Sequence, residues 1–85
     1  MKRIMTDRRL LERIERNPEV MLGKPVVRGT RITVELILDL LAKGQREDDV
    51  LREYPELKPD DIKAALAYAS AALGTEETHW VKASA

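Results

Sequence analysis

Apolar side chains recur with the period of an α-helix in three consecutive segments of this sequence, residues 34–43, 47–54 and 60–73. Each segment is bounded by residues that start or stop helices, namely Thr33, Gly44, Pro55, Pro59 and Gly74. Short connections between such helices are typical of helix-turn-helix domains, with 47–54 and 60–73 as the paired helices. We therefore expect a mainly α fold built on a homeodomain-like three-helix bundle.

The same periodicity predicts which helical side chains face the core. The expected inner residues are Val34, Leu36, Ile37, Leu38, Leu40 and Leu41 in the first helix, Val50, Leu51 and Tyr54 in the second, and Ile62, Ala65, Leu66, Ala69 and Leu73 in the third. The apolar stripe of the first helix is wide, which indicates burial on two sides. We expect this helix to form core and to be a candidate dimer seam.

Shorter elements are expected before the bundle. A short amphipathic helix capped by Thr6 is predicted first, and its apolar face consists of Leu10, Leu11 and Ile14. Asn17 and Pro18 should end it, because the residue before a proline avoids the helical conformation. Asn17 can also cap a further helical turn that closes at Gly23.

Residues 23–34 predict a β-hairpin with Gly29 and Thr30 as the central pair of a type II′ turn, since that turn needs positive φ first. In this register Arg28 faces Arg31, while Val27 and Ile32 face each other on the core side. Two like charges placed opposite each other are mildly destabilising.

The paired guanidinium groups suggest an anion site. Arg28 and Arg31 could grip a partner's carboxylate or a phosphate through forked hydrogen bonds, aimed by Gly29 and Thr30 and flanked by Lys24. The alternative is a solvated edge that discourages sheet-to-sheet aggregation.

Length and composition limit the class of protein. A chain of 85 residues buries only about 60 to 65 per cent of its unfolded surface, so its stability is marginal unless association or a very regular helical core adds to it. We expect a homodimer or higher oligomer. Cysteine is absent, which removes disulfides and thiolate metal sites, and phenylalanine is absent, which leaves an aliphatic core. No signal-peptide pattern or membrane-length apolar run is present, so we expect a cytoplasmic protein.

The net charge is zero, but the charges are unevenly distributed. Residues 1–16 carry six basic and three acidic side chains, residues 17–34 carry three and one, and the remainder carries six and eleven. Such polarity suits head-to-tail docking, or a basic end that meets nucleic acid and an acidic end that meets a basic partner. The alternative is that helical surfaces simply carry charges.

The acidic start of the third helix disfavours the use of that helix as the DNA-recognition helix. Asp60 and Asp61 lie in its first turn with only Lys58 and Lys63 nearby, and carboxylates repel a phosphate backbone. If operator DNA is bound, most contacts are expected from the hairpin and the N-terminal segment. The basic residues concerned are Arg8, Arg9, Lys24, Arg28 and Arg31.

An ordered set of motifs resembles the small prokaryotic family called domain of unknown function 433, regarded as antitoxin-like helix-turn-helix proteins. The motifs are Asn17-Pro18, Gly23-Lys24-Pro25, Arg28-Gly29-Thr30-Arg31-Ile32, Tyr54-Pro55 with Leu57, and Asp61-Ile62 leading to Ala64, Ala65, Leu66, Ala67 and Tyr68. The resemblance spans about residues 14–73. It implies a β-hairpin before the three helices, often a PIN-type nuclease toxin as operon partner, and no enzymatic activity.

Two positions depart from the family pattern. Arg46 and Lys58 stand where that pattern tends to have a Ser or Thr helix cap. Losing such a cap typically costs about 1 kcal/mol, which the acidic first turns must offset through the helix dipole. We expect these two helix starts to fray.

The C-terminal segment 75–85 lies outside the resemblance and is treated as a tail on a single domain of residues 1–74. Trp80 is a candidate anchor for another chain, since large aromatics dominate interface energies; alternatively it packs on its own domain or on a symmetry mate. His79 has no second histidine or cysteine with which to bind a metal ion.

No persuasive nucleophile and base can be assembled, so no catalysis, metal or cofactor is expected. The leading hypothesis is an antitoxin that neutralises a PIN-like nuclease toxin and regulates its own operon. The alternatives are a DNA-binding transcriptional regulator without a toxin, and a purely structural homodimer.

Overall fold

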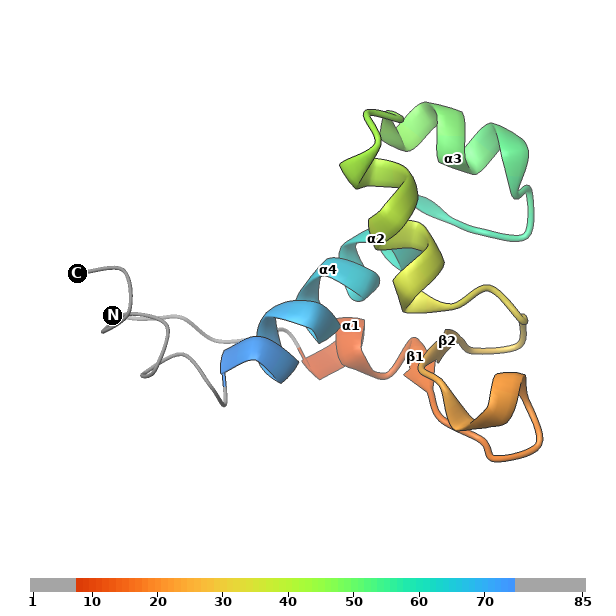
Figure 1. Ribbon diagram of the computed structural model, residues 1–85, viewed down its shortest axis with the longest axis vertical. Coiled ribbons are helices and arrows are strands. Elements are labelled where there is room, and N and C mark those ends of the chain that lie inside the picture. The colour runs from red at the N-terminus through yellow and green to blue at the C-terminus, as the bar shows by residue number, and fades with distance from the viewer. Residues whose placement is uncertain (1–7, 75–85) are drawn as a thin grey trace.

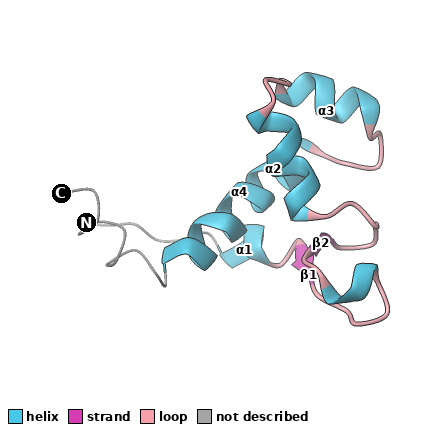
Figure 2. Cartoon of the chain, in the orientation of Figure 1, coloured by secondary structure: helices cyan, strands magenta, loops and turns pink. Residues whose placement is uncertain are grey.

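The computed structural model describes residues 8–74, in which helices dominate and the two strands are very short (Figures 1 and 2). In chain order the elements are α1 (Arg8–Leu11), β1 (Ile14–Glu15), the single turn η1 (Met21–Gly23), β2 (Val26–Val27), α2 (Val34–Ala42), α3 (Glu47–Glu53) and α4 (Pro59–Gly74). In Figure 1 α3 lies at one end of the molecule, and β1, β2 and the loop that joins them lie at the other, with α2 and α4 between. We call the second of these the β1–β2 end. This is the predicted mainly α fold, with a short helix and a hairpin before three helices.

The three main helices begin and end within a residue of their predicted bounds. Thr33 caps α2 as expected, because its Oγ1 accepts a hydrogen bond from the Leu36 N–H at 2.9 Å. At the other end Gly44 has a φ of +98°, which permits the chain to leave the helix. Prolines 55 and 59 bound the α3–α4 connection.

The starts of α3 and α4 use the same substitute for the missing hydroxyl cap. The side chain of Arg46 makes no capping hydrogen bond, but Asp49 Oδ2 accepts the Arg46 N–H at 2.9 Å. Asp61 Oδ2 likewise accepts the Lys58 N–H at 2.8 Å. Each acid therefore acts through a direct hydrogen bond as well as through the helix dipole.

The hairpin differs from its prediction in strand pairing. β2 pairs in antiparallel register with β1, so that Ile14 lies opposite Val27. Ile14 thus belongs to a strand and not to the first helix, which ends at Leu11. On its other edge β2 keeps part of the predicted hairpin, because Val27 N–H donates to the Ile32 carbonyl at 2.9 Å.

The turn of this hairpin lies one residue earlier than predicted. Thr30 N–H donates to the Val27 carbonyl at 2.9 Å, so Arg28 and Gly29 are the central residues. Gly29 has a φ of +82°, which places the positive φ at the second central position and makes the turn type II. The need for glycine at position 29 was predicted correctly, but the turn type was wrong.

The hydrophobic core takes residues from the two strands as well as from the three main helices. Its buried members are Ile14, Val27, Ile32, Val34, Ile37, Val50, Leu57, Ile62, Ala64 and Ala65. The inner face of α4 is rotated relative to the prediction, because Asp61 and Ala64 are buried while Leu66 and Leu73 are exposed. The rotation brings Asp61 to a partner on the N-terminal segment, described below.

Candidate functional site

The two arginines of the turn have different surroundings. Arg28 Nε donates to the Glu12 carbonyl at 2.8 Å, and its Nη1 lies 3.3 Å from Glu15 Oε1. Its backbone N–H donates to the Arg13 carbonyl at 2.7 Å. Arg28 therefore fastens the turn to the chain between α1 and β1.

Arg31 is exposed and makes no hydrogen bond or ion pair with the part of the chain that the structure describes. Its backbone is nevertheless well fixed, because Thr30 Oγ1 donates to the Val27 carbonyl at 2.8 Å and accepts the Ile32 N–H at 3.0 Å. Ile32 itself is buried in the core. Within residues 8–74 the turn thus presents one unpaired guanidinium, while the predicted joint grip by both arginines stays a prediction.

Lys24 forms an exposed ion pair with Glu35 on α2, with its Nζ 3.2 Å from Oε1. Exposed pairs of this kind contribute about 0 to 1 kcal/mol, so Lys24 can exchange its partner at little cost. The pair links the chain just before β2 to the first turn of α2.

The loop between β1 and β2 has a backbone conformation that the sequence did not predict. Met21, Leu22 and Gly23 have consecutive φ values of +49°, +59° and +81°, where a right-handed helical turn was expected. Asn17 Oδ1 accepts the Glu19 N–H at 2.9 Å, but this bond starts a separate turn at residues 17–20, and the residue before η1 is Val20, whose side chain makes no cap. Side chains with a Cβ pay about 1 to 2 kcal/mol for this left-handed conformation.

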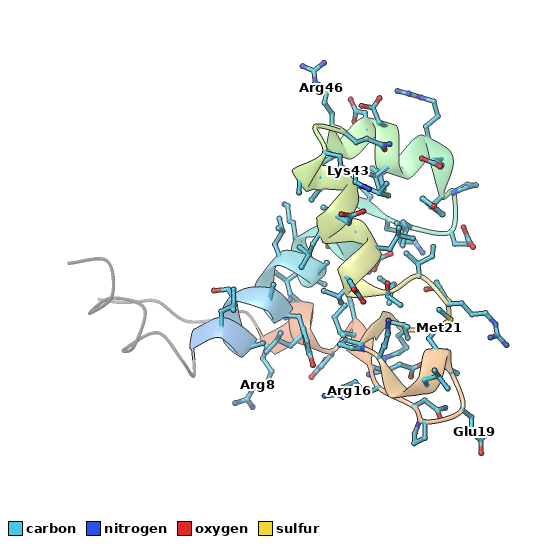
Figure 3. All side chains as sticks on the ribbon, in the orientation of Figure 1. Arg8, Arg16, Glu19, Met21, Lys43 and Arg46 are labelled. Atoms are coloured by element: carbon cyan, nitrogen blue, oxygen red, sulfur yellow. The ribbon has the colours of Figure 1, made fainter. Side chains whose placement is uncertain are left out.

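The left-handed turn places apolar side chains in solvent. Leu22 is 91% exposed, and Met21 beside it is also exposed. We call these two residues the tip; Figure 3 shows Met21, Glu19 and Arg16 together on this loop, far from Arg46. Arg16 braces the loop, since its Nε donates to the Gly23 carbonyl at 2.9 Å. Sequence carried no signal for the tip, because neither Met nor Leu favours positive φ.

The acidic start of α4 is tied to the N-terminal segment. Arg13 Nη1 lies 2.9 Å from Asp61 Oδ1, and its Nη2 lies 3.7 Å from Asp60 Oδ2. The side chain of Asp61 is 7% exposed and that of Arg13 is 37% exposed. Asp61 therefore serves as a tertiary anchor besides capping α4, and much of the acidic charge expected there is compensated. These groups line a hollow together with Arg28, whose guanidinium is already bonded.

The start of α3 shows the electrostatic effect of such a cap at an exposed position. The Arg46 N–H that donates to Asp49 lowers the pKa of this carboxyl, and the Arg52 guanidinium lowers the pKa further. The carboxylate is favoured because both donors bond its charged form.

An open apolar groove lies between α2 and the C-terminal half of α4. Its apolar lining consists of Pro25, Val34, Leu38, Ala42, Tyr68, Ala69, Ala72 and Leu73, and Glu35 and Asp39 also line it. We call it the α2–α4 groove. Leu38 was predicted to be core on a helix buried on two sides. The groove is the second side, and residues 8–74 leave it open.

Other predicted features fall elsewhere. Trp80 and His79 lie outside the described residues. Among residues 8–74 no three side chains of the metal-binding types come together. Nor does any helix in that range have the length and apolarity that a membrane crossing requires.

Comparisons with known proteins point to one family. The family model described as "Protein of unknown function (DUF433)" matches residues 14–69. The uncharacterized protein y4eO of Sinorhizobium fredii (strain NBRC 101917 / NGR234) is 35% identical over 60 residues, which cover 71% of this chain and 27% of that protein. The chain therefore spans only about a quarter of the length of this relative.

A solved structure shares the fold. The crystal structure of a DUF433 member protein from Anabaena variabilis ATCC 29413 superposes with a TM-score of 0.69 at 27% sequence identity. The superposition covers 79% of this chain and 66% of the other.

Proposed function

We propose that this chain, which belongs to the DUF433 family of proteins of unknown function, is a non-catalytic binding module that acts as an antitoxin. In this proposal it is a cytoplasmic homodimer that neutralises a PIN-like nuclease toxin and regulates its own operon. The antitoxin role and the nuclease partner rest on the motifs that resemble the family. The structure adds support for a binding end formed by β1, β2 and the turn after them.

The observation that carries the proposal is the difference in pairing among the basic residues of the hairpin segment. Lys24 and Arg28 have acidic partners within the chain, whereas Arg31 has none among the described residues. A fixed backbone beneath an unpaired guanidinium lowers the entropy that is lost when an anion binds. Arg31 is therefore the residue best placed to meet an acidic partner group.

A nuclease offers chemically suitable groups to such an arginine. Enzymes that hold Mg²⁺ for phosphodiester cleavage do so with carboxylates. A guanidinium that forms forked hydrogen bonds with one of them competes with metal or substrate binding. This interaction would neutralise the enzyme without any chemistry performed by the antitoxin.

Affinity purification of the tagged full chain from its native host tests the proposal. A small nuclease should copurify with the wild type, and Arg31→Glu should reduce its recovery about tenfold through charge reversal at a central contact. Arg46→Glu is the matched control: Figure 3 places Arg46 at the far end of the molecule, and its side chain makes no capping bond. This variant should recover the nuclease normally.

Two outcomes would contradict the proposal. One is the absence of a nuclease from cells shown to express both genes. The other is equal loss of recovery in the Arg31 and Arg46 variants, which would indicate general charge effects and not a site. If operator DNA is not bound either, the remaining reading is a purely structural homodimer.

DNA binding without a toxin is the second candidate, and the contact between Arg13 and Asp61 favours it. Because Arg13 compensates Asp61 and lies near Asp60, the first turn of α4 repels phosphate less than its sequence suggests. A mobility-shift assay with the upstream promoter should show binding that weakens steeply with salt. Absent or salt-independent binding would remove this candidate.

A further inference from the structure

Two apolar features of this molecule are left open to solvent by the described residues. One is convex, the tip formed by Met21 and Leu22, and the other is concave, the α2–α4 groove. We propose that they cover each other between two copies of this chain, so that the tip of each copy inserts into the groove of the other. The inference gives the dimer of the proposed function its contact surface and rests on that part of it alone.

The backbone of the tip supports a contact role. Met21 and Leu22 adopt a left-handed conformation, and against the rest of residues 8–74 Leu22 stays 91% exposed and Met21 39% exposed. Strained segments persist where the surrounding structure enforces them, and they cluster at functional sites. Here Arg16, Asn17 and the loop hydrogen bonds hold the turn in place and leave Leu22 outside.

The charges beside the two features are complementary. Arg16 and Lys24 flank the tip, whereas Glu35 and Asp39 are among the residues that line the groove. Asp39 already pairs with Lys43 at 2.9 Å, so Glu35 is the main acidic group on the groove side. The existing exposed pair between Lys24 and Glu35 can be replaced by equivalent pairs across the interface. A second copy therefore satisfies both the apolar and the charged parts of this surface.

The position of the tip favours a closed pair over a chain of copies. Pro25 lines the groove only three residues after Leu22, and Lys24 pairs with Glu35, which also lines the groove. Each tip thus starts beside its own groove, and two copies related by a two-fold axis can exchange tips reciprocally. Reciprocal exchange gives an isologous interface, which closes at two subunits.

Analytical ultracentrifugation of the full chain provides the first test. The wild type should sediment as a dimer, and Leu22→Glu should raise the dimer dissociation constant at least about tenfold, because a charge would enter an apolar groove. Leu66→Glu is the matched control, since Leu66 is an exposed leucine on α4 that does not line the groove. It should leave the dimer unchanged.

Disulfide trapping identifies the two surfaces directly, because the chain has no cysteine of its own. Leu22→Cys chains mixed with Ala42→Cys chains should form mixed disulfides under mild oxidation. Leu22→Cys chains mixed with Glu56→Cys chains should not, since Glu56 lies on the turn between α3 and α4. Circular dichroism of each variant confirms that its fold is intact.

Several results would overturn the inference. They are a monomeric wild type at about 100 µM, a dimer that survives Leu22→Glu, disulfides only between two Leu22→Cys chains, and loss of the dimer in Trp80→Ala. The last would assign the contact to the tail. Loss of nuclease recovery by Leu22→Glu with an unchanged dimer would assign the tip to the toxin. A monomeric wild type would also remove the homodimer from the proposed function. Toxin binding is tested separately, because the recovery of the nuclease by Arg31→Glu does not depend on the dimer contact.

Discussion

Two turns at the β1–β2 end contain residues with positive φ, but in only one of them is every such residue a glycine, the type that favours this conformation. In the turn 27–30 the left-handed residue is Gly29, at +82°, and Thr30 locks the turn with its hydroxyl. In the loop before β2 the left-handed residues include Met21 and Leu22, which favour this conformation poorly. The first turn has the residues that its backbone requires, and the second does not. The left-handed backbone of the tip therefore costs folding free energy, and the result is an apolar side chain that is exposed to solvent.

Arg13→Ala should give the largest loss of folding free energy, and it should weaken both turns to the same degree. It leaves the buried Asp61 carboxylate without its guanidinium, and removing a charged hydrogen-bonding partner of this kind costs about 2 kcal/mol. Urea denaturation measures the loss, and amide hydrogen exchange should rise at Gly23 and Thr30 alike. Arg16→Ala, which removes an exposed brace of the loop, should cost about 0.5 kcal/mol or less. Equal losses in both variants would contradict the anchoring role of Asp61.

Gly29→Ala tests the turn whose residues fit. A Cβ at this position would have no atom within 4 Å, so any loss comes from the backbone at a φ of +82°. We expect a loss of about 1 to 2 kcal/mol in urea denaturation. Gly74→Ala is the control in equally open space without a positive φ, and it should be neutral or slightly stabilising. An unchanged stability for Gly29→Ala would mean that the turn carries no strain of this kind.

Leu22→Asn tests the turn whose residues do not fit. Asparagine tolerates the left-handed region, and Leu22 is too exposed to lose packing, so the monomer should gain about 1 kcal/mol. Thermal unfolding of dilute protein measures this gain. The same variant should associate more weakly, so that stability and binding move in opposite directions. Destabilisation of the monomer would show that Leu22 packs within its own chain.

The titration of Asp49 at the start of α3 should have the smallest effect on stability, and this residue lies outside both turns. Because the pKa of Asp49 is lowered below 3.8 in the folded chain, its stabilising contribution is present above pH 3.8 and is lost as the pH falls further. An NMR pH titration should place the Asp49 midpoint below 3.8. Arg52→Gln should retain most of the lowering, since the Arg46 N–H is its larger cause. A normal midpoint in that variant would make Arg52 the main cause.

The helical part of this fold was predictable because its local signals agree with one another. Thr33, Gly44 and Pro59 mark helix bounds through their own chemistry, whatever the helices pack against. The inner face of α4 was less predictable, because hydropathy predicts a buried Leu66 and an exposed Asp61, whereas Leu66 is exposed and Asp61 is buried. The rotation of this face depends on long-range contacts, namely the ion pair of Asp61 with Arg13 and the burial of Ile62, Ala64 and Ala65 in the core.

The candidate site was predictable to a similar degree. Gly29, Thr30 and Arg31 follow from turn chemistry, although the turn itself is shifted by one residue. The pairing of Arg28 with the α1–β1 segment could not be read from the sequence, since it depends on the strand order. The left-handed tip was missed because residue preferences oppose it, which is the usual signature of a conformation imposed by its surroundings.

Hydrogen exchange of the copurified complex tests most directly whether the β1–β2 end is the binding end. Compared with the free chain, the complex should slow exchange in residues 16–33 and leave α3 unchanged. Protection centred on residues 47–53, with the β1–β2 end exchanging as in the free chain, would contradict the account.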